Sequence, residues 1–235
     1  MTEGISRVAV IGAGTMGAGI AQVSATAGWT TVLTDTRPEA LGAARTTIGR
    51  HLDGAVERGK LTTEERDATL DRLSTTESLA QACDGADLVI EAVVEDLSVK
   101  QAVLGEAAQH ASESALLASN TSSLSLAAIA ESLPRPERCL GLHFFNPVHI
   151  MKLVEIVEHD GVTADVRSEA VAVVESMGKE PIVVKDSPGF ASSRLGIALG
   201  MEAIRMVEQG VASPADIDKA MELGYKHPMG PLRLT

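Results

Sequence analysis

Two side chains that could move a proton flank a turn-prone segment in the middle of the chain. His143 and Glu155 are 12 residues apart, on either side of residues 146–149. If the β-rich runs around them pair as an antiparallel ribbon centred on His149, the two side chains lie directly opposite each other. A carboxylate fixes the tautomer of a facing imidazole and raises its proton affinity, so the pair predicts a general base with its orienting partner.

Each of these residues taken alone has a simpler interpretation. His143 could be a hydrogen-bonded core histidine, and Glu155 could be an exposed strand residue. The remaining histidines have no comparable partner in the sequence, and we expect them to be structural. They are His51, His110, His149, His159 and His227.

A glycine-rich turn near the N-terminus could hold a diphosphate. Gly12, Gly14 and Gly17 directly follow the apolar run 7–11 and open a helical pattern. In this spacing the first glycine permits a tight turn, the second allows close approach of a pyrophosphate, and the third lets the helix lie against the sheet. The helix N-terminus then holds the diphosphate, so the turn predicts a dinucleotide site.

An acidic residue completes that pattern. Asp35 ends the next β-rich run, 18 residues after Gly17. Its carboxylate would bind the adenosine ribose and repel a 2′-phosphate, which favours NAD over NADP, although the nearby Arg37 works against this preference. We therefore expect the glycines, Thr15, Met16 and Asp35 to bind NAD. The alternative is a plain βα turn in which Asp35 caps a helix.

Polar residues also follow two later apolar runs, at the carboxyl ends of strands where open α/β sheets bind ligands. Glu95 follows the run 87–94 and could lie near the nicotinamide or its ribose, and Lys100 shares this prediction. A solvated loop carboxylate is the alternative. Residues 119–123, Ser-Asn-Thr-Ser-Ser, could face the same site or simply cap a helix.

The elements that must position these residues alternate between short β-rich runs and helical patterns. Helical patterns separate four β-rich runs, at 7–11, 30–35, 87–94 and 115–120. Parallel strands joined by right-handed helical crossovers give a doubly wound, Rossmann-type α/β sheet. The charged stretch 38–73 reads as two helices, because Thr62, Thr63 and Glu65 resemble a second N-cap and first turn.

The second half of the chain predicts an antiparallel excursion and then helices. The β-rich runs 138–145 and 152–159 are followed by a helix over 164–177 and a last strand over 181–186. From Phe190 onward the pattern is helical only, so we place a domain boundary near residue 187.

Composition and charge exclude several classes of protein. The formal net charge of −12 argues against a nucleic-acid or acidic-membrane partner, because such binding needs basic side chains. Cys83 and Cys139 have no framework or metal-site spacing, so we expect two buried thiols with no disulfide and no metal. With neither a signal peptide nor an 18-residue apolar stretch, we expect a cytoplasmic protein.

Several motifs of the chain resemble the L-3-hydroxyacyl-CoA (3-hydroxybutyryl-CoA) dehydrogenase family. The resemblance runs from about residue 6 to the C-terminus, and its most specific part is GLHFFNP followed by MKLVE. The matching segments are 12–21 (GAGTMGAGIA), 119–123 (SNTSS), 141–157 (GLHFFNPVHIMKLVEIV), 185–190 (KDSPGF) and 224–232 (GYKHPMGPL).

This resemblance implies an NAD-binding Rossmann domain over residues 1–186 and a helical domain starting at 187–235. The helical domain would close the substrate cleft and form a homodimer. The implied activity interconverts (S)-3-hydroxyacyl-CoA and 3-oxoacyl-CoA with NAD. The resemblance further implies a short-chain substrate, such as 3-hydroxybutyryl-CoA, and a role in fatty acid metabolism. Members of the family continue for about 50 further residues of helix, so 187–235 would be part of a larger helical domain.

The resemblance also implies roles for residues of the catalytic centre. His143 matches the catalytic base and Glu155 its carboxylate partner. Ser122 matches the serine that binds the substrate oxygen at the reacting carbon, and Asn146 matches an asparagine beside the site.

Further positions match cofactor and substrate ligands of the family. Asp35 matches the ligand of the adenosine ribose, and the NAD site would also include Glu95, Lys100 and Asn120. Arg50 and Arg58 become candidates for binding the CoA phosphates.

One substitution departs from the family pattern. Where the family has an asparagine that helps to bind the substrate, this chain has Ser193. A serine keeps one donor and one acceptor but is shorter, so a water could bridge the gap.

Two other functions stay open from the sequence. The chain could be a catalytically silent NAD-binding or assembly module, or a related dehydrogenase that acts on a free hydroxy acid.

Overall fold

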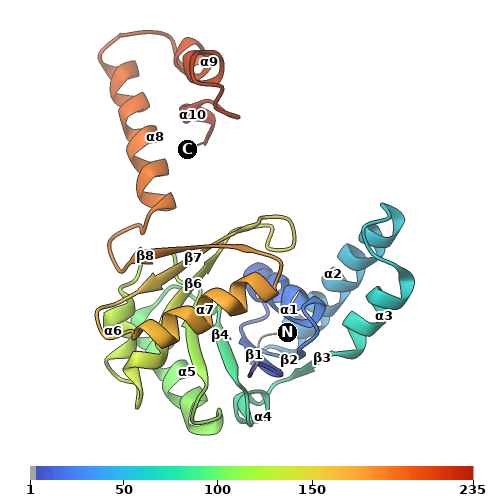
Figure 1. The fold of residues 1–235 in the computed structure, drawn as a ribbon. Coiled ribbons are helices and arrows are strands. Elements are labelled where there is room, and N and C mark those ends of the chain that lie inside the picture. The colour runs from blue at the N-terminus through green and yellow to red at the C-terminus, as the bar shows by residue number, and fades with distance from the viewer. Residues whose placement is uncertain (1–3, 235) are drawn as a thin grey trace. The chain divides into compact units, whose positions relative to one another are not determined.

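The apolar runs of the first part of the chain form one sheet with helices on both faces (Figure 1). The computed structural model describes residues 4–234. Contacts divide the chain into two compact units, residues 1–186 and residues 187–235. Each unit has its own helices, and the sheet lies within the first.

The sheet of the first unit has the predicted mostly parallel, doubly wound topology. Its order is β3-β2-β1-β4-β5-β6-β7-β8, with parallel pairing from β3 through β6, β7 antiparallel to β6, and β8 parallel to β7. Within the described residues the strands are β1 (Arg7–Ile11), β2 (Thr30–Thr34), β3 (Leu73–Thr76), β4 (Leu88–Glu91), β5 (Leu116–Ser119), β6 (Cys139–Phe144), β7 (Leu153–Glu158) and β8 (Glu180–Lys185).

Helices cover the two faces of this sheet because the strands are apolar on both. One continuous core joins α1, α2 and α7 to alternate strand residues, and α4, α5 and α6 pack on the other face. The helices of this unit are α1 (Thr15–Thr26), α2 (Pro38–Glu57), α3 (Thr63–Asp71), α4 (Leu79–Cys83), α5 (Leu97–His110), α6 (Leu126–Ala130) and α7 (Ala164–Ser176), with a short 3-10 turn η1 (Pro136–Arg138).

The predicted break in the long helical stretch is confirmed. Thr62 caps α3: its Oγ1 accepts a hydrogen bond from the Glu65 amide at 3.1 Å, and the Glu65 carboxylate accepts one from the Thr62 amide at 2.8 Å. This reciprocal capping box satisfies amide groups that the helix itself leaves unbonded. Helices α2 and α3 therefore form a hairpin at the β3 side of the unit (Figure 1).

The extent of that helical stretch was predicted wrongly, and two elements were missed. Leu73 is the first residue of strand β3 rather than the end of a helix, and α4 follows it. β3 is an edge strand of sequence LSTT, in which only Leu73 is a buried apolar residue, so it lacks the alternation that signals a strand. The strand predicted over 87–94 is also longer than β4, which ends at Glu91.

Among its described residues the second unit has helices joined by short turns and no strand. It contains α8 (Ser192–Glu208), α9 (Pro214–Gly224) and α10 (Pro231–Leu234). The Ser213 side chain caps α9 by accepting from the Asp216 amide, and Pro214 occupies the first turn, where its missing amide hydrogen costs no hydrogen bond. Asp218, 7% exposed, accepts from the Leu232 amide at 2.8 Å and so ties α10 to α9.

Two further expectations concern the whole chain. Among the described residues no helix is long and apolar enough to cross a membrane. Cys83 and Cys139 are free and fully buried, as predicted, and burial raises the pKa of each thiol to about 12.

Candidate active site

The predicted His–Glu pair is formed by the register of β6 and β7. His143 on β6 lies directly opposite Glu155 on β7, and Nδ1 of the imidazole is 2.7 Å from Oε2 of the carboxylate. Glu155 is fully buried and His143 is 7% exposed. This confirms the predicted facing geometry. A buried carboxylate on Nδ1 favours the tautomer in which Nε2 carries the lone pair, which is the state a general base requires.

The glycine turn has the close contacts that its sequence requires. Gly12 has φ of +100°, and a Cβ there would lie 2.6 Å from the carbonyl oxygen of Ala92. A Cβ on Gly17 would overlap the Gly12 carbonyl, whereas a Cβ on Gly14 would meet no atom within 4 Å. Only glycine fits at the first and third positions. The second leaves the backbone open to a diphosphate at the N-terminus of α1, where Thr15 and Met16 begin the helix.

Asp35 is held firmly beside this turn. Its Oδ2 accepts a hydrogen bond from the Ala13 amide at 2.9 Å, and its Oδ1 accepts from the Arg37 amide at 2.9 Å and from Arg37 Nε at 3.2 Å. Burial raises the pKa of Asp35, but the hydrogen bonds from Ala13 and Arg37 outweigh it and leave the pKa below its usual value. Asp35 therefore stays ionised at neutral pH.

A pocket extends from the glycine turn over Asp35. It has a volume of about 660 Å³ and an apolar floor that includes Val94 and Val99. Gly12, Gly14, Asp35 and Arg37 also line it, so one carboxylate and one cation face a largely apolar space. These residues fit the adenosine half of a dinucleotide, because the ring needs an apolar surface and the ribose needs an acceptor.

Lys100 and Glu95, both predicted at the NAD site, form part of a buried ionic cluster. The Lys100 side chain is 1% exposed, and its Nζ lies 2.6 Å from Glu91 Oε1 and 3.2 Å from Glu95 Oε2. Burial raises the pKa of Glu95, but hydrogen bonds from Thr121 and the charge of Lys100 outweigh it and leave the pKa below its usual value. The cluster lies at the carboxyl ends of β4 and β5.

The loop 119–123 is bonded to both neighbouring elements. Ser122 donates its backbone amide to Glu95 Oε1 at 3.1 Å, and its side chain is exposed. The Asn120 side-chain oxygen accepts from the Phe144 amide at 2.9 Å. Asn120 thus connects the loop to the residue that follows His143, while the loop also carries Ser122.

Asn146 lies in the connection from β6 to β7, close to the glycine turn. It lines a pocket of about 260 Å³ together with Gly14 and Thr15. A Cβ on Gly19 of α1 would lie 2.7 Å from Cβ of Val148, so the connection packs closely on α1 at this glycine. The structure therefore brings Asn146 and the predicted diphosphate site to the same pocket.

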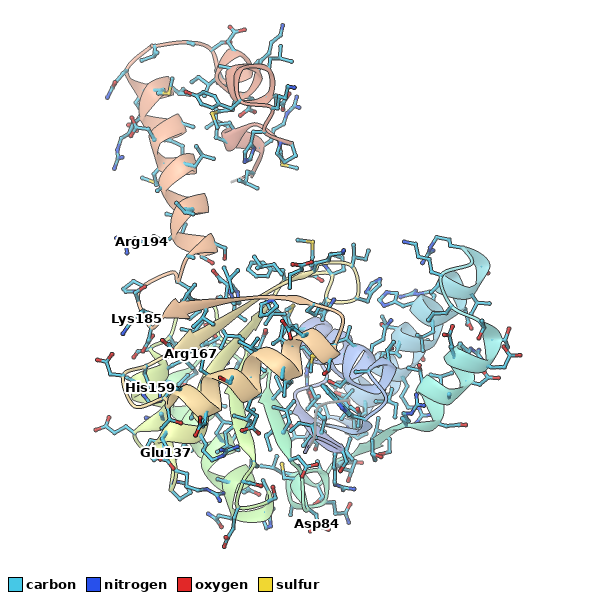
Figure 2. All side chains as sticks on the ribbon, in the orientation of Figure 1. Asp84, Glu137, His159, Arg167, Lys185 and Arg194 are labelled. Carbon is cyan, nitrogen blue, oxygen red and sulfur yellow. The ribbon has the colours of Figure 1, made fainter. Side chains whose placement is uncertain are left out.

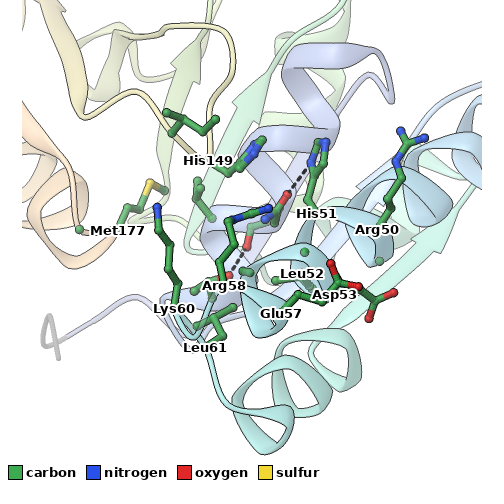
Figure 3. A pocket seen from close by; sticks show the side chains of 18 of the residues that line it. Arg50, His51, Leu52, Asp53, Glu57, Arg58, Lys60, Leu61, His149 and Met177 are labelled. Carbon is green, nitrogen blue, oxygen red and sulfur yellow. Dashed lines mark hydrogen bonds between the residues drawn. The ribbon is translucent and has the colours of Figure 1, made fainter.

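Arg50 and Arg58 line a larger pocket beside α2 (Figure 3). Its volume is about 1220 Å³, and both side chains are exposed. Cationic side chains outnumber carboxylates in its lining. The charged lining residues are Arg45, Arg50, Arg58, Lys60 and Lys179 against Asp53 and Glu57. This local excess of positive charge suits a polyanion in a chain whose net charge is negative.

Two histidines that the sequence left without partners stack on each other in this pocket. The rings of His51 and His149 have centroids 4.2 Å apart and planes 26° apart, and Figure 3 shows them side by side. Burial lowers the pKa of both imidazoles, with Arg50 adding to the effect on His51. His149 is also close to Lys179, whose Nζ donates to the Met151 carbonyl at 2.8 Å.

Two further predicted positions lie in other segments of the chain. His159, labelled in Figure 2, lies 3.1 Å from the carbonyl oxygens of both Pro136 and Cys139, which agrees with a structural role. Ser193 lies in the first turn of α8, in the second unit.

Glu91 and Ser119 are the site residues that the sequence analysis missed. Glu91 is fully buried at the end of β4 and accepts from Ser119 Oγ at 2.7 Å. The available signal was a single carboxylate inside an otherwise apolar strand, Leu-Val-Ile-Glu, because a buried acid needs a partner. The charged partner of Glu91 is Lys100, which lies nine residues away on α5.

The fold and this site define an NAD-binding oxidoreductase of the Rossmann class. Residues 7–187 match the family described as 3-hydroxyacyl-CoA dehydrogenase, NAD binding domain, and residues 189–235 match its C-terminal domain. The chain belongs to the 3-hydroxyacyl-CoA dehydrogenase family. The predicted family, enzyme class and NAD cofactor are thereby confirmed.

Individual relatives agree over nearly the whole chain. A probable 3-hydroxybutyryl-CoA dehydrogenase of Bacillus subtilis is 40% identical over 98% of this chain and 80% of its own length. A 3-hydroxyadipyl-CoA dehydrogenase of Escherichia coli is 44% identical over 100% of this chain and 49% of its own. The crystal structure of (S)-3-hydroxybutyryl-CoA dehydrogenase from Ralstonia eutropha superposes with a TM-score of 0.92 at 38% identity, covering 98% of this chain and 81% of that one.

Proposed function

We propose that the chain interconverts (S)-3-hydroxyacyl-CoA and 3-oxoacyl-CoA, with His143 as the general base. The observation that carries this proposal is the buried His143–Glu155 pair, 2.7 Å apart. Bound NAD supplies the hydride acceptor, and the protein must supply the group that takes the hydroxyl proton. With Nδ1 held by the carboxylate, His143 Nε2 receives that proton and Glu155 stabilises the imidazolium.

The residues around this pair bind the oxygen on which the charge changes. Ser122 donates its hydroxyl to that oxygen, and Asn146 donates its side-chain amide to it. Donors fixed before the reaction stabilise the developing charge without reorganisation, so both act on the transition state more than on the bound substrate. Ser193, in the first turn of α8, is the remaining residue proposed to bind the substrate. In the reverse direction His143 returns the proton to the same oxygen.

The cofactor is held by the glycine turn and by the side chains around it. Gly12, Gly14 and Gly17 with Thr15 and Met16 hold the diphosphate at the N-terminus of α1. Asp35 accepts from the adenosine ribose. Glu95, Lys100 and Asn120 complete the site on the side of the nicotinamide ribose, where they also hold the loop that carries Ser122.

The CoA part of the substrate is assigned to the cationic pocket beside α2. Arg50 and Arg58 project from α2 and its C-terminal end into that pocket, where cations outnumber carboxylates. A short acyl chain is proposed because the named relatives act on hydroxybutyryl and hydroxyadipyl thioesters.

Exposed apolar side chains on α8 and two free thiols bear on the assembly and location of the protein. We propose a homodimer formed through the helical unit, whose α8 exposes Leu195, Ile197 and Met201. Measurement of the solution mass tests this. Two free, buried thiols support a reducing, cytoplasmic location. The family supports a role in fatty acid metabolism.

The decisive experiment is the reduction of acetoacetyl-CoA with NADH, followed by loss of NADH absorbance. We expect turnover with acetoacetyl-CoA and little with free acetoacetate at the same concentration. Equal rates with both would favour a dehydrogenase of free hydroxy acids. Binding of NADH without turnover of either substrate would favour a silent cofactor-binding module and overturn the proposal.

A further inference from the structure

Glu91 is a fully buried carboxylate of the sheet, and the roles proposed above do not use it. It is 0% exposed and ends β4, the strand next to β1 and its glycine turn. Its Oε1 accepts from Lys100 Nζ at 2.6 Å and from the Val93 amide at 2.9 Å, and its Oε2 accepts from Ser119 Oγ at 2.7 Å. Three donors from three segments therefore converge on one carboxylate.

Two chains of hydrogen bonds lead from Glu91 to the loop 119–123. The first passes through Ser119, whose Oγ accepts from the Thr121 amide at 3.2 Å. The second passes through Lys100 to Glu95 Oε2 at 3.2 Å.

Glu95 then distributes the second chain over the loop. Its Oε1 accepts from Thr121 Oγ1 at 2.5 Å, from the Ser122 amide at 3.1 Å and from Ser123 Oγ at 3.1 Å. The two chains thus end on groups of Thr121, Ser122 and Ser123, so they hold the segment that carries the Ser122 side chain.

Stability alone does not account for this arrangement. Taking a lysine and a carboxylate out of water costs several kcal/mol per ion, and well-packed apolar residues in place of a buried ion pair are often as stabilising. Charged hydrogen bonds, however, have defined directions and lengths, which apolar contacts lack. What the cluster provides is a fixed position for the groups that it binds.

We propose that Glu91 is a positioning residue, which holds Ser122 at the reacting oxygen through Lys100–Glu95 and through Ser119. The inference rests on the proposed function, because it assumes that Ser122 binds that oxygen. Glu91 itself contacts neither substrate nor cofactor in this scheme. Its loss should affect the transition state, where donor placement matters most, more than substrate binding.

The test is Glu91→Gln, which keeps the shape of the side chain but removes its charge. We expect kcat for acetoacetyl-CoA reduction to fall about ten- to a hundredfold, with a smaller change in KM, as for a misplaced group. Hydrogen exchange of the backbone over residues 119–124 should become faster, measured without substrate or cofactor. Glu106→Gln is the matched control, because it removes one charge from the exposed face of α5.

Ser119→Ala provides a second variant if the buried glutamine prevents folding. It cuts only one of the two chains, so we expect a partial, severalfold loss of kcat and faster exchange confined to the loop. Unchanged kcat in either folded variant overturns the proposal. So does faster exchange spread evenly over α1 and α5, which would indicate general destabilisation.

A parallel measurement on His143→Gln separates this proposal from the proposed function. If that variant keeps its turnover, the proposed chemistry fails whatever Glu91 does. If it loses turnover while Glu91→Gln keeps it, only the positioning role fails.

Discussion

Two charged regions of the first unit differ in how far their charged side chains are buried and paired. At the carboxyl edge of the sheet, Glu91, Lys100, Glu155 and His143 are less than a tenth exposed, and each is bonded to a charged partner. Beside α2, Arg50 and Arg58 are exposed and line an open pocket. The first region is organised before any ligand arrives, whereas the second acts through its excess of charge.

This contrast implies different energetic weights. Interactions between fixed, buried groups act on the transition state and can be worth several kcal/mol. Exposed ionic contacts are screened by water and salt and are worth about 0.2–1 kcal/mol each. Substitutions at the sheet edge should therefore change kcat strongly, and those beside α2 should change KM modestly.

The largest effect is expected at His143. His143→Gln should lower kcat by about 10² to 10⁴, the range for a lost general base, with NADH affinity nearly unchanged. Steady-state rates and NADH fluorescence titration measure the two quantities. His110→Gln, on an exposed histidine at the end of α5, should keep both. Near-native turnover of His143→Gln would mean that another group takes the proton.

The next effect concerns the choice between NADH and NADPH. The unmutated protein should prefer NADH, because the ionised Asp35 repels a 2′-phosphate. Asp35→Ala should narrow the ratio of the two dissociation constants about ten- to a hundredfold, from loss of charged hydrogen bonds worth about 1.5–3 kcal/mol. It also frees Arg37 from its partner, so adding Arg37→Ala should restore part of the preference. Equal affinities before mutation would contradict this assignment.

A smaller effect is expected in the open pocket. Replacing Arg50 and Arg58 together by alanine should raise KM for acetoacetyl-CoA about two- to thirtyfold, with less change in kcat. The effect should shrink in high salt. A truncated N-acetylcysteamine thioester, which lacks the nucleotide, is the control substrate. An equal loss for both thioesters would remove these arginines from the CoA site.

The smallest effect is expected at Ser193. Ser193→Asn should change kcat/KM by less than about tenfold, because one hydrogen bond that a water can replace contributes about 0.5–1.5 kcal/mol. Comparison of acetoacetyl-CoA reduction by the two proteins measures it. A gain of a hundredfold or more would show that serine disables the site, and would favour the silent module.

Sequence reasoning was most successful where one repeating pattern determines the geometry. The pairing of His143 with Glu155 followed from a period of two on either side of one turn, so a centre at His149 fixed the register. The glycine turn and Asp35 also followed, because few residue types tolerate those backbone positions.

Contacts between distant elements could not be predicted in the same way. The bond between Glu91 and Lys100 depends on how α5 packs on β4, and the stack of His51 on His149 joins α2 to the β6–β7 connection. Neither has a spacing that repeats along the chain. Strand β3 escaped prediction for a local reason, since a polar edge strand carries no apolar alternation.

The two buried cysteines allow opening of the first unit to be measured by thiol labelling. Both thiols of the chain lie in that unit, Cys83 on α4 and Cys139 on β6, and a pKa of about 12 leaves almost no thiolate to react at neutral pH. A thiol reagent can modify them only when the protein opens locally or globally. Labelling rates at these two positions therefore report how often the structure opens around α4 and around β6, in the unmodified sequence and without an introduced probe.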